Sequence, residues 1–155
     1  MGEGIMLHRS VGTSVLFSNG LYKEKWQTSG DASAGDTLHV SGYPGQTGYS
    51  YAYLAEPISL AGFNILEVKA TKTSNYSGQI SLADIKITGA DSPISTGSPA
   101  AAISLPNGED VKTELDISGL DSTEKYKIVI QAYGMNIDGD VIKATVDASL
   151  IRLRR

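Results

Sequence analysis

The feature that most constrains the fold of this chain is an alternation of apolar and polar residues with a period of two. It is clearest in four segments, which are residues 66–73, 80–88, 126–134 and 141–154. In a β-strand successive side chains point to opposite faces, so each segment would bury one face and expose the other. The segment at 80–88 changes phase at Ala83–Asp84, which indicates a β-bulge. No segment keeps the period of 3.6 residues that an amphipathic helix needs.

Clusters of Gly, Pro, Asn, Asp and Ser separate these segments, and such residues supply the φ values that tight turns need. The clusters lie at residues 18–20, 29–36, 43–48, 88–99, 106–110 and 136–140. Residues 58–70 and 116–132 also share a plan, in which Ile-Ser and a glycine-containing turn lead into an alternating strand. We therefore predict an all-β fold of roughly eight to ten strands, an antiparallel jelly-roll-like β-sandwich with almost no helix.

A length of 155 residues predicts one domain. We assign residues 16–155 to a single β-sandwich domain and residues 1–15 to an N-terminal arm or first strand. Hydrophobic residues make up 41% of the chain and charged residues 19%, a balance typical of an ordered globular protein.

Several chemistries are excluded or made implausible by composition. The chain has no cysteine, so disulfides, thiolate nucleophiles and cysteine-ligated metals are excluded. The formal net charge is -4 and there is no basic stripe, so we expect no nucleic-acid partner. Arg152 and Arg154 alternate with Ile151 and Leu153 in the manner of a final strand with its arginines in water. No stretch of eighteen apolar residues predicts membrane insertion.

The residues that catalysis requires are sparse. There are only two histidines, His8 and His39, and we expect His39 to point outward from its strand. A glycosidase would need two carboxylates across a cleft, for which Glu67 and Asp84 are candidates. Glu67 lies beside Lys69, where a solvated strand face explains it. We therefore predict that the protein is not an enzyme.

One segment could hold a metal ion. Asn136, Asp138 and Asp140 place oxygen ligands at alternate positions, and Gly139 permits a tight turn, an arrangement that suits calcium. Asp-Gly is also a strong signal for a two-residue hairpin turn. We favour the plain turn as the explanation of these residues, and we predict no cofactor other than one structural calcium that the segment could bind as the alternative.

Aromatic residues are the main candidates for ligand binding. Tyr49, Tyr51 and Tyr53 share one face of a strand, whereas Ala52 and Leu54 share the other. If Ala52 and Leu54 face the core, the tyrosines form an exposed surface on which sugar rings could stack; otherwise the tyrosines are core. The other candidates for this surface are Tyr43, Trp26 and Tyr76. Trp26 would fit the core equally well, and Tyr76 would be exposed in a turn.

The order of these features resembles a small β-sandwich domain of phage and prophage tail or baseplate appendage proteins, and it is similar to carbohydrate-binding modules of the jelly-roll type. The elements that carry the resemblance are residues 16–26, 48–54, 58–70, 115–134 and 147–154. The resemblance implies a non-enzymatic structural or adhesion domain of a tail appendage that could recognise cell-surface glycan. It also implies a homo-oligomer or larger tail assembly on the virion, made in the host cytoplasm without a signal peptide. The alternative is a stand-alone carbohydrate-binding module that uses an aromatic ladder.

Overall fold

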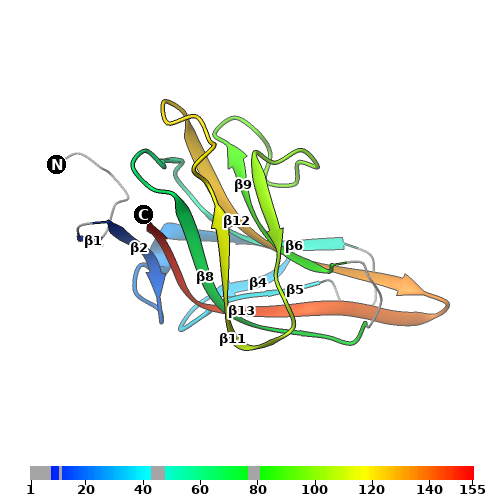
Figure 1. The fold of residues 1–155 in the computed structure, drawn as a ribbon. Helices are drawn as coiled ribbons and strands as arrows, with labels where there is room; N and C mark the ends of the chain where they lie inside the picture. Colours follow the sequence, from blue (N-terminus) through cyan, green and yellow to red (C-terminus); the bar gives the residue numbers. More distant parts are fainter. Residues whose placement is uncertain (1–7, 11, 43–47, 77–80) are drawn as a thin grey trace.

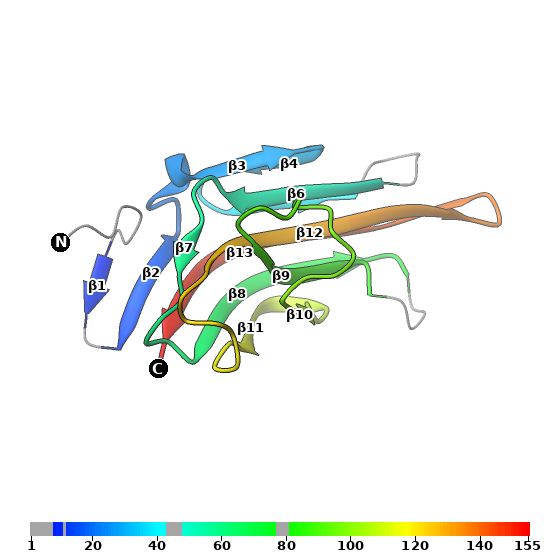
Figure 2. The ribbon, with the colours of Figure 1, turned by 90° about the horizontal axis from the view of Figure 1, so that it is seen from above.

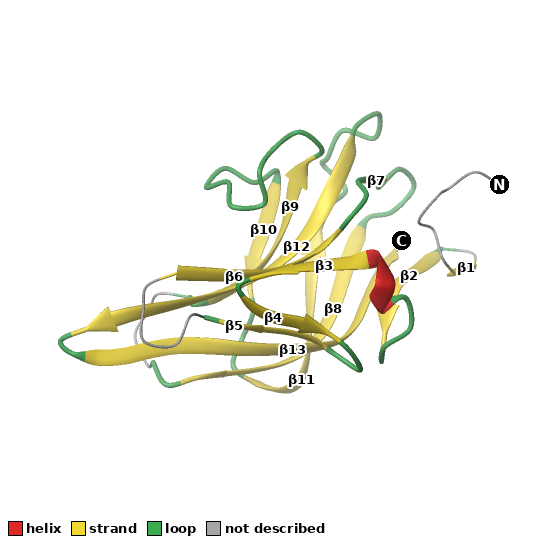
Figure 3. Cartoon of the chain, turned by 180° about the vertical axis from the view of Figure 1, so that it is seen from behind, coloured by secondary structure: helices red, strands yellow, loops and turns green. Residues whose placement is uncertain are grey.

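A computed structural model describes residues 8–10, 12–42, 48–76 and 81–155, and these residues form thirteen antiparallel strands and one short 3₁₀ helix, η1 (Lys23–Lys25). The strands of what we call sheet A are β1 (His8–Ser10), β2 (Thr13–Ser18), β4 (Asp31–Ala34), β5 (Leu38–Ser41), β8 (Ile65–Ser74), β11 (Gly108–Asp116) and β13 (Asp140–Arg154). Sheet B contains β3 (Trp26–Ser29), β6 (Gly48–Leu54), β7 (Ile58–Ser59), β9 (Ala83–Gly89), β10 (Ala101–Ser104) and β12 (Lys125–Ile137). The predicted all-β sandwich is confirmed (Figure 3).

Sheet A is organised around β13. One edge of β13 pairs with β8, which in turn pairs with β11. The other edge pairs first with β5 and then with β2, and β4 and β1 extend the sheet beyond them. β2 begins at Thr13, so residues 13–15 belong to the sandwich.

Sheet B is organised around β12. Its two edges pair with β9 and β6, and β10 and β3 flank these two strands. The short strand β7 pairs with the start of β12. Sheet B therefore has the order β10-β9-β12-β6-β3, which places β6 and β9 on either side of the central strand.

The long β12–β13 hairpin joins the two sheets. Gly134 to Ile137 pair with Asp140 to Lys143, and beyond this stretch β12 enters sheet B and β13 enters sheet A. Asp138 and Gly139 form the turn with φ of 50° and 85°, and positive φ at both central residues matches a type I′ hairpin turn. The hairpin extends beyond the rest of the two sheets (Figures 1 and 2).

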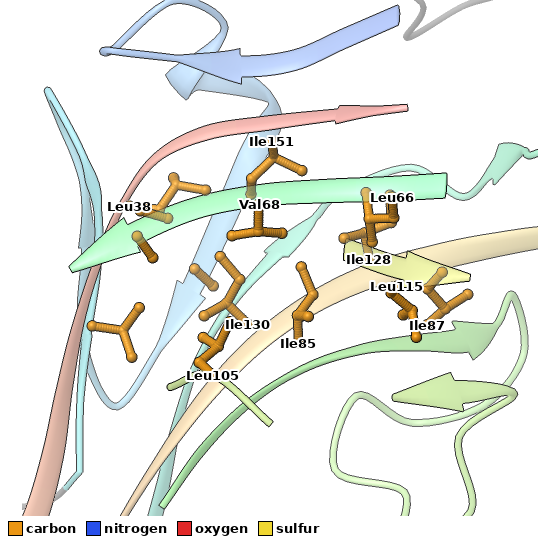
Figure 4. Packing of buried hydrophobic residues seen from close by; sticks show 14 of the residues in the cluster. Leu38, Leu66, Val68, Ile85, Ile87, Leu105, Leu115, Ile128, Ile130 and Ile151 are labelled. Carbon is orange, nitrogen blue, oxygen red and sulfur yellow. The ribbon is translucent and has the colours of Figure 1, made fainter. Parts of the chain in front are cut away.

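The core fills the space between the sheets with the apolar faces that the alternation predicted. The inward residues include Leu66 and Val68 of β8, Ile85 and Ile87 of β9, Ile128 and Ile130 of β12, and Ile151 of β13 (Figure 4). All seven side chains are completely buried, and each buried Leu, Ile or Val contributes about 1.5–3 kcal/mol of hydrophobic stabilisation.

The structure differs from the sequence predictions in two local respects. The strand expected to bulge at Ala83–Asp84 begins at Ala83 and pairs with β12 without a register shift, so the change of phase marks the start of the strand. The number of strands exceeds the prediction because several, such as β7 with two residues, are too short to show alternation.

The two segments with a shared plan lie together at one end of the sandwich. We call the glycine-containing turn of each segment its corner. The backbone N–H of Ile117 donates to the carbonyl of Asn64 at 2.9 Å, which joins the corner of the second segment to that of the first. The first corner leads into β8 of sheet A, and the second leads into β12 of sheet B. The similar corners therefore start one central strand in each sheet.

Candidate functional site

The tyrosines of β6 lie on the outer face of sheet B. Ser50, Ala52 and Leu54 are completely buried on the inner face, so the alternating Tyr49, Tyr51 and Tyr53 point outward. This arrangement is the first of the two alternatives that the sequence left open. Tyr49 has 41% of its surface exposed, whereas Tyr51 and Tyr53 are half-buried.

Tyr49 is the centre of a small aromatic group. Its ring stacks on Tyr51 with a centroid distance of 6.0 Å and an interplanar angle of 19°. The ring of Tyr49 also contacts Tyr133 of β12, with a centroid distance of 4.4 Å and an interplanar angle of 35°. Tyr133 is the direct cross-strand partner of Tyr49, a pairing that sequence alternation within β12 could not reveal.

A row of polar groups continues from Tyr51 across the sheet. Gln131 of β12 pairs with Tyr51 on one side and with Asp84 of β9 on the other. The side-chain amide of Gln131 donates to Asp84 Oδ2 at 3.1 Å. This contact fixes the carboxylate beside the aromatic group, and sequence reasoning had considered Asp84 only as a glycosidase candidate.

Lys86 lies on the same face of β9, two residues after Asp84. It is only 3% exposed, its Nζ donates to the carbonyl of Thr96 at 3.0 Å, and it lies 5.7 Å from the centre of the Tyr51 ring. Burial lowers the pKa of Lys86, and the negative charge of Asp84 opposes that shift. The site thus contains a largely buried amine held in a fixed position, which the sequence pattern of β9 did not single out.

The loop of residues 90–100 covers part of this face (Figure 2). Thr96 accepts the hydrogen bond from Lys86, and Ser92 O accepts one from Lys127 Nζ. Val129 points to the outer face yet is completely buried, which is consistent with the loop lying over it. The Thr88 hydroxyl on the same face is buried without a partner among the described residues.

A pocket of about 410 Å³ lies between this loop and the tyrosines. It is lined by Tyr49, Tyr51, Asp84, Lys86, Ser95, Thr96, Gly97, Pro99, Ala102, Ile103, Ser104 and Gln131. Pockets that bind small molecules usually have volumes of about 300–1,000 Å³ and a few convergent polar groups. We refer to this pocket with its tyrosines as the outer-face pocket.

The phenol groups at the pocket stay protonated at neutral pH. Burial raises the pKa of Tyr49, and Asp84 and Tyr133 raise it further. Burial also raises the pKa of Tyr51, with a contribution from Tyr49. Both hydroxyls can therefore donate a hydrogen bond as well as accept one.

Other hollows of similar volume have different linings. One of about 420 Å³ lies at the shared corners, and its only aromatic side chain, Phe63, is buried. Another, of about 500 Å³, lies beside Asn107 and has no aromatic residue in its lining. The outer-face pocket is the better candidate because it combines aromatic rings with buried charged and amide groups.

Trp26 and Tyr76, which were also predicted as ligand-binding aromatic residues, do not line the pocket. Trp26 is 5% exposed, packs edge-on against Phe17 at 6.5 Å and donates its Nε1–H to the Leu16 carbonyl at 3.1 Å. It is therefore a core residue and not an extension of the aromatic surface. Tyr76 was expected to be exposed but is half-buried against the core. Tyr43 lies outside the described residues.

The predicted calcium ligands lie in the turn of the β12–β13 hairpin. Asp138 is a central residue of that turn, Asp140 begins β13 directly after it, and Asn136 lies in β12 two residues before Asp138. Within the described ranges, no group of three or more His, Asp or Glu residues is placed to hold a metal ion. The hairpin explains these residues, and calcium binding by them stays a prediction.

The two candidate glycosidase carboxylates lie on opposite sides of the molecule. Asp84 is on the outer face of sheet B, whereas Glu67 is on the outer face of sheet A. Glu67 is only 2% exposed and pairs with Arg152 at 2.9 Å and Arg154 at 3.0 Å, and Arg154 also pairs with Glu114. Its environment is thus an ion-pair network and not the solvated strand face expected from sequence. The two carboxylates cannot flank one glycosidic bond.

Two further sequence predictions concern His39 and the membrane. His39 points outward between buried Leu38 and Val40, as expected, and its Nδ1 lies 2.9 Å from Asp147 Oδ1. Of the residues that the structure describes, none forms a helix long and apolar enough to cross a membrane.

Comparison with known proteins supports the fold. The chain is similar to the carbohydrate recognition domain of Emp47p, with a TM-score of 0.58 and 11% sequence identity over 95% of this chain and 99% of that domain. It also matches the low-affinity xylan-binding module CBM86 from the gut symbiont Roseburia intestinalis, at 13% identity over 89% of this chain and 95% of the module. The TM-score of that second match is 0.47. No family model and no curated protein matches the sequence.

Proposed function

We propose that this protein is a non-enzymatic carbohydrate-binding domain and that the outer-face pocket is its binding site. The observation that carries the proposal is the stacked pair of Tyr49 and Tyr51 beside a pocket that also contains Asp84, Gln131 and Lys86. Aromatic faces suit the apolar C–H surfaces of sugar rings, and the polar groups suit their hydroxyls. The similarity of the fold to the carbohydrate recognition domain of Emp47p supports this proposal.

The narrower biological setting rests on the sequence resemblance alone. An adhesion domain of a phage-type tail appendage would form a homo-oligomer or join a larger assembly on the virion, whereas a stand-alone module would not need to. The molar mass in solution, measured by light scattering, separates these two versions. One structural calcium in the β12–β13 turn is also proposed from sequence, and melting with calcium or with a chelator tests it.

The experiment for the main proposal is a binding screen with two matched variants. The wild-type chain is tested against a panel of polysaccharides by affinity electrophoresis or on a glycan array. Tyr49→Ala removes the exposed ring and should weaken binding by about tenfold or more, as expected for a binding hot spot. Tyr53→Ala is the control, because Tyr53 lies on the same strand and face but does not line the pocket.

Two outcomes would contradict the proposal. Wild-type protein that binds no glycan in a broad panel would remove the function itself. Equal loss of binding in the Tyr49→Ala and Tyr53→Ala variants would move the site away from the outer-face pocket. Circular dichroism of both variants would show whether each has kept its fold.

A further inference from the structure

The charged groups of the outer-face pocket indicate which class of sugar it would take. Among the twelve residues of its lining, only Asp84 and Lys86 carry a full charge, so their charges of −1 and +1 cancel. Each has a different protein partner, since Asp84 accepts from Gln131 and Lys86 donates to Thr96. Neither is among the ion pairs found between the described residues.

The two groups are therefore not paired with each other, and both retain hydrogen-bonding capacity. Asp84 Oδ2 accepts from Gln131, while Oδ1 has no protein donor in the described part of the chain. Lys86 uses one of its three N–H groups on Thr96. Because the residues are two apart on one strand, their backbones are about 6.6–6.8 Å apart, and a ligand can contact both.

A hydroxyl group matches both charges, because it can donate to a carboxylate and accept from an ammonium. A ligand carboxylate or sulfate would match Lys86 but would be repelled by Asp84, and a ligand amine would have the reverse problem. Like charges near one another in a partly buried site are costly because water screens them poorly. The arrangement thus disfavours charged ligands of either sign.

We infer that the outer-face pocket binds an uncharged sugar through neighbouring hydroxyl groups, of which one donates to Asp84 and another accepts from Lys86. This inference rests on the proposed carbohydrate-binding function and narrows its ligand class. The sugar ring would contact Tyr49 and Tyr51, whose hydroxyls add further hydrogen bonds. Gln131 and Thr96 act as positioning groups, because they hold the carboxylate and the amine in place.

The test compares neutral glycans with glycans that carry uronate or sulfate groups, at low and at high ionic strength. Neutral glycans should bind, and their affinity should change less than about twofold with salt, because no net charge is paired. Acidic glycans of the same backbone should bind at least about tenfold more weakly. Both measurements use the wild-type chain, so they do not depend on the folding of any variant.

Three variants locate the effect at the two charges. Asp84→Asn and Lys86→Met should each weaken binding of a neutral glycan by about tenfold, a usual effect of losing a hydrogen bond to a charged group. Lys127→Met is the matched control, because Lys127 also donates to the loop of residues 90–100, at Ser92, but does not line the pocket. Its affinity should equal that of the wild type.

The outcomes separate this inference from the function on which it rests. Preferential binding of acidic glycans, with affinity that falls as salt rises, would overturn the uncharged-sugar inference and leave carbohydrate binding in place. Wild-type affinity in both the Asp84→Asn and Lys86→Met variants would also overturn it. If no glycan of either kind binds, the proposed function and the inference fail together.

Discussion

Single residues at the outer-face pocket differ in their surroundings even when they share a strand. Tyr49 and Tyr53 point the same way from β6, but only Tyr49 is strongly exposed and lines the pocket. Lys86 and Lys127 both hold the loop of residues 90–100, but only Lys86 lines the pocket. The position of a residue on a strand face therefore does not decide its role.

The buried amine of Lys86 should affect stability as a function of pH. Burial lowers its pKa in the folded state below the ordinary value of 10.5. Between the lowered pKa and 10.5 the unfolded chain binds more protons, so the free energy of unfolding rises with pH in that window. The Lys86→Met variant lacks this group. The free energy of unfolding of the wild type relative to this variant should therefore increase from neutral pH towards pH 10.5.

Urea unfolding of both proteins at several pH values measures this difference. The raised pKa values of Tyr49 and Tyr51 lower the free energy of unfolding as the pH rises above 10. Both proteins contain these tyrosines, so their effect cancels to first order in the comparison. A difference in stability that stays constant with pH would show that the amine of Lys86 titrates normally.

Sequence alternation placed the tyrosines of β6 on one face, because a strand leaves only two choices for each side chain. Alternation could not show whether the tyrosines face the core or the solvent, since Ser50 and Ala52 on the opposite face are small enough for either position. It also missed Tyr133 and the role of Lys86, because both depend on cross-strand partners and on a loop that folds back over the sheet. Trp26 was ambiguous from sequence and became a core residue through its contacts with Phe17 and Leu16.

At the scale of elements, the β12–β13 hairpin determines how the two sheets are joined. Its Asp-Gly turn was recognised in the sequence because the φ values of a type I′ turn restrict the residues that fit it. The partners of β12 and β13 were not predictable, because some lie more than a hundred residues away in the chain, as β2 and β5 do from β13. Strand register of this kind depends on tertiary packing.

The turn predicts the effect of one substitution. Gly139 has a φ of 85° and open space around its Cα, so a methyl group there would meet no atom within 4 Å. Gly139→Ala should still destabilise the protein by about 1–2 kcal/mol, because the left-handed conformation is costly for any residue with a Cβ. Thermal or urea unfolding measures the effect.

Gly119→Ala is the control for that substitution. Gly119 also has open space around it and lies outside the left-handed region, so alanine there should leave stability unchanged or raise it by about 0.4–1 kcal/mol. Equal stability of the Gly139→Ala variant and the wild type would mean that the turn adopts a different conformation.

At the scale of the whole molecule, sheets A and B approach each other closely at the base of the hairpin. A Cβ on Gly42, which follows β5, would lie 2.3 Å from the backbone nitrogen of Gly134 and 2.4 Å from the carbonyl carbon of Tyr133. The Gly42 N–H also donates to the Ala144 carbonyl at 3.0 Å, so the backbone cannot easily move away. The sandwich therefore requires a glycine at this point.

Gly42→Ala should destabilise the protein by roughly 3 kcal/mol, the upper part of the range for overpacked sites. The clash involves backbone atoms of β12, which cannot be relieved by a change of rotamer. Gly35→Ala is a suitable comparison, because no atom lies within 4 Å of the methyl group it would add. Similar melting temperatures for the two variants would show that the sheets do not meet as described.

NMR mapping of the tyrosine rings tests whether a sugar binds to the outer-face pocket through Tyr49 and Tyr51. The protein is labelled at its tyrosine rings and titrated with the neutral oligosaccharide that binds best in the glycan screen. We expect the signals of Tyr49 and Tyr51 to shift on saturation and that of buried Tyr126 to stay in place. Saturable shifts confined to other tyrosines, with Tyr49 and Tyr51 unchanged, would contradict binding at this pocket.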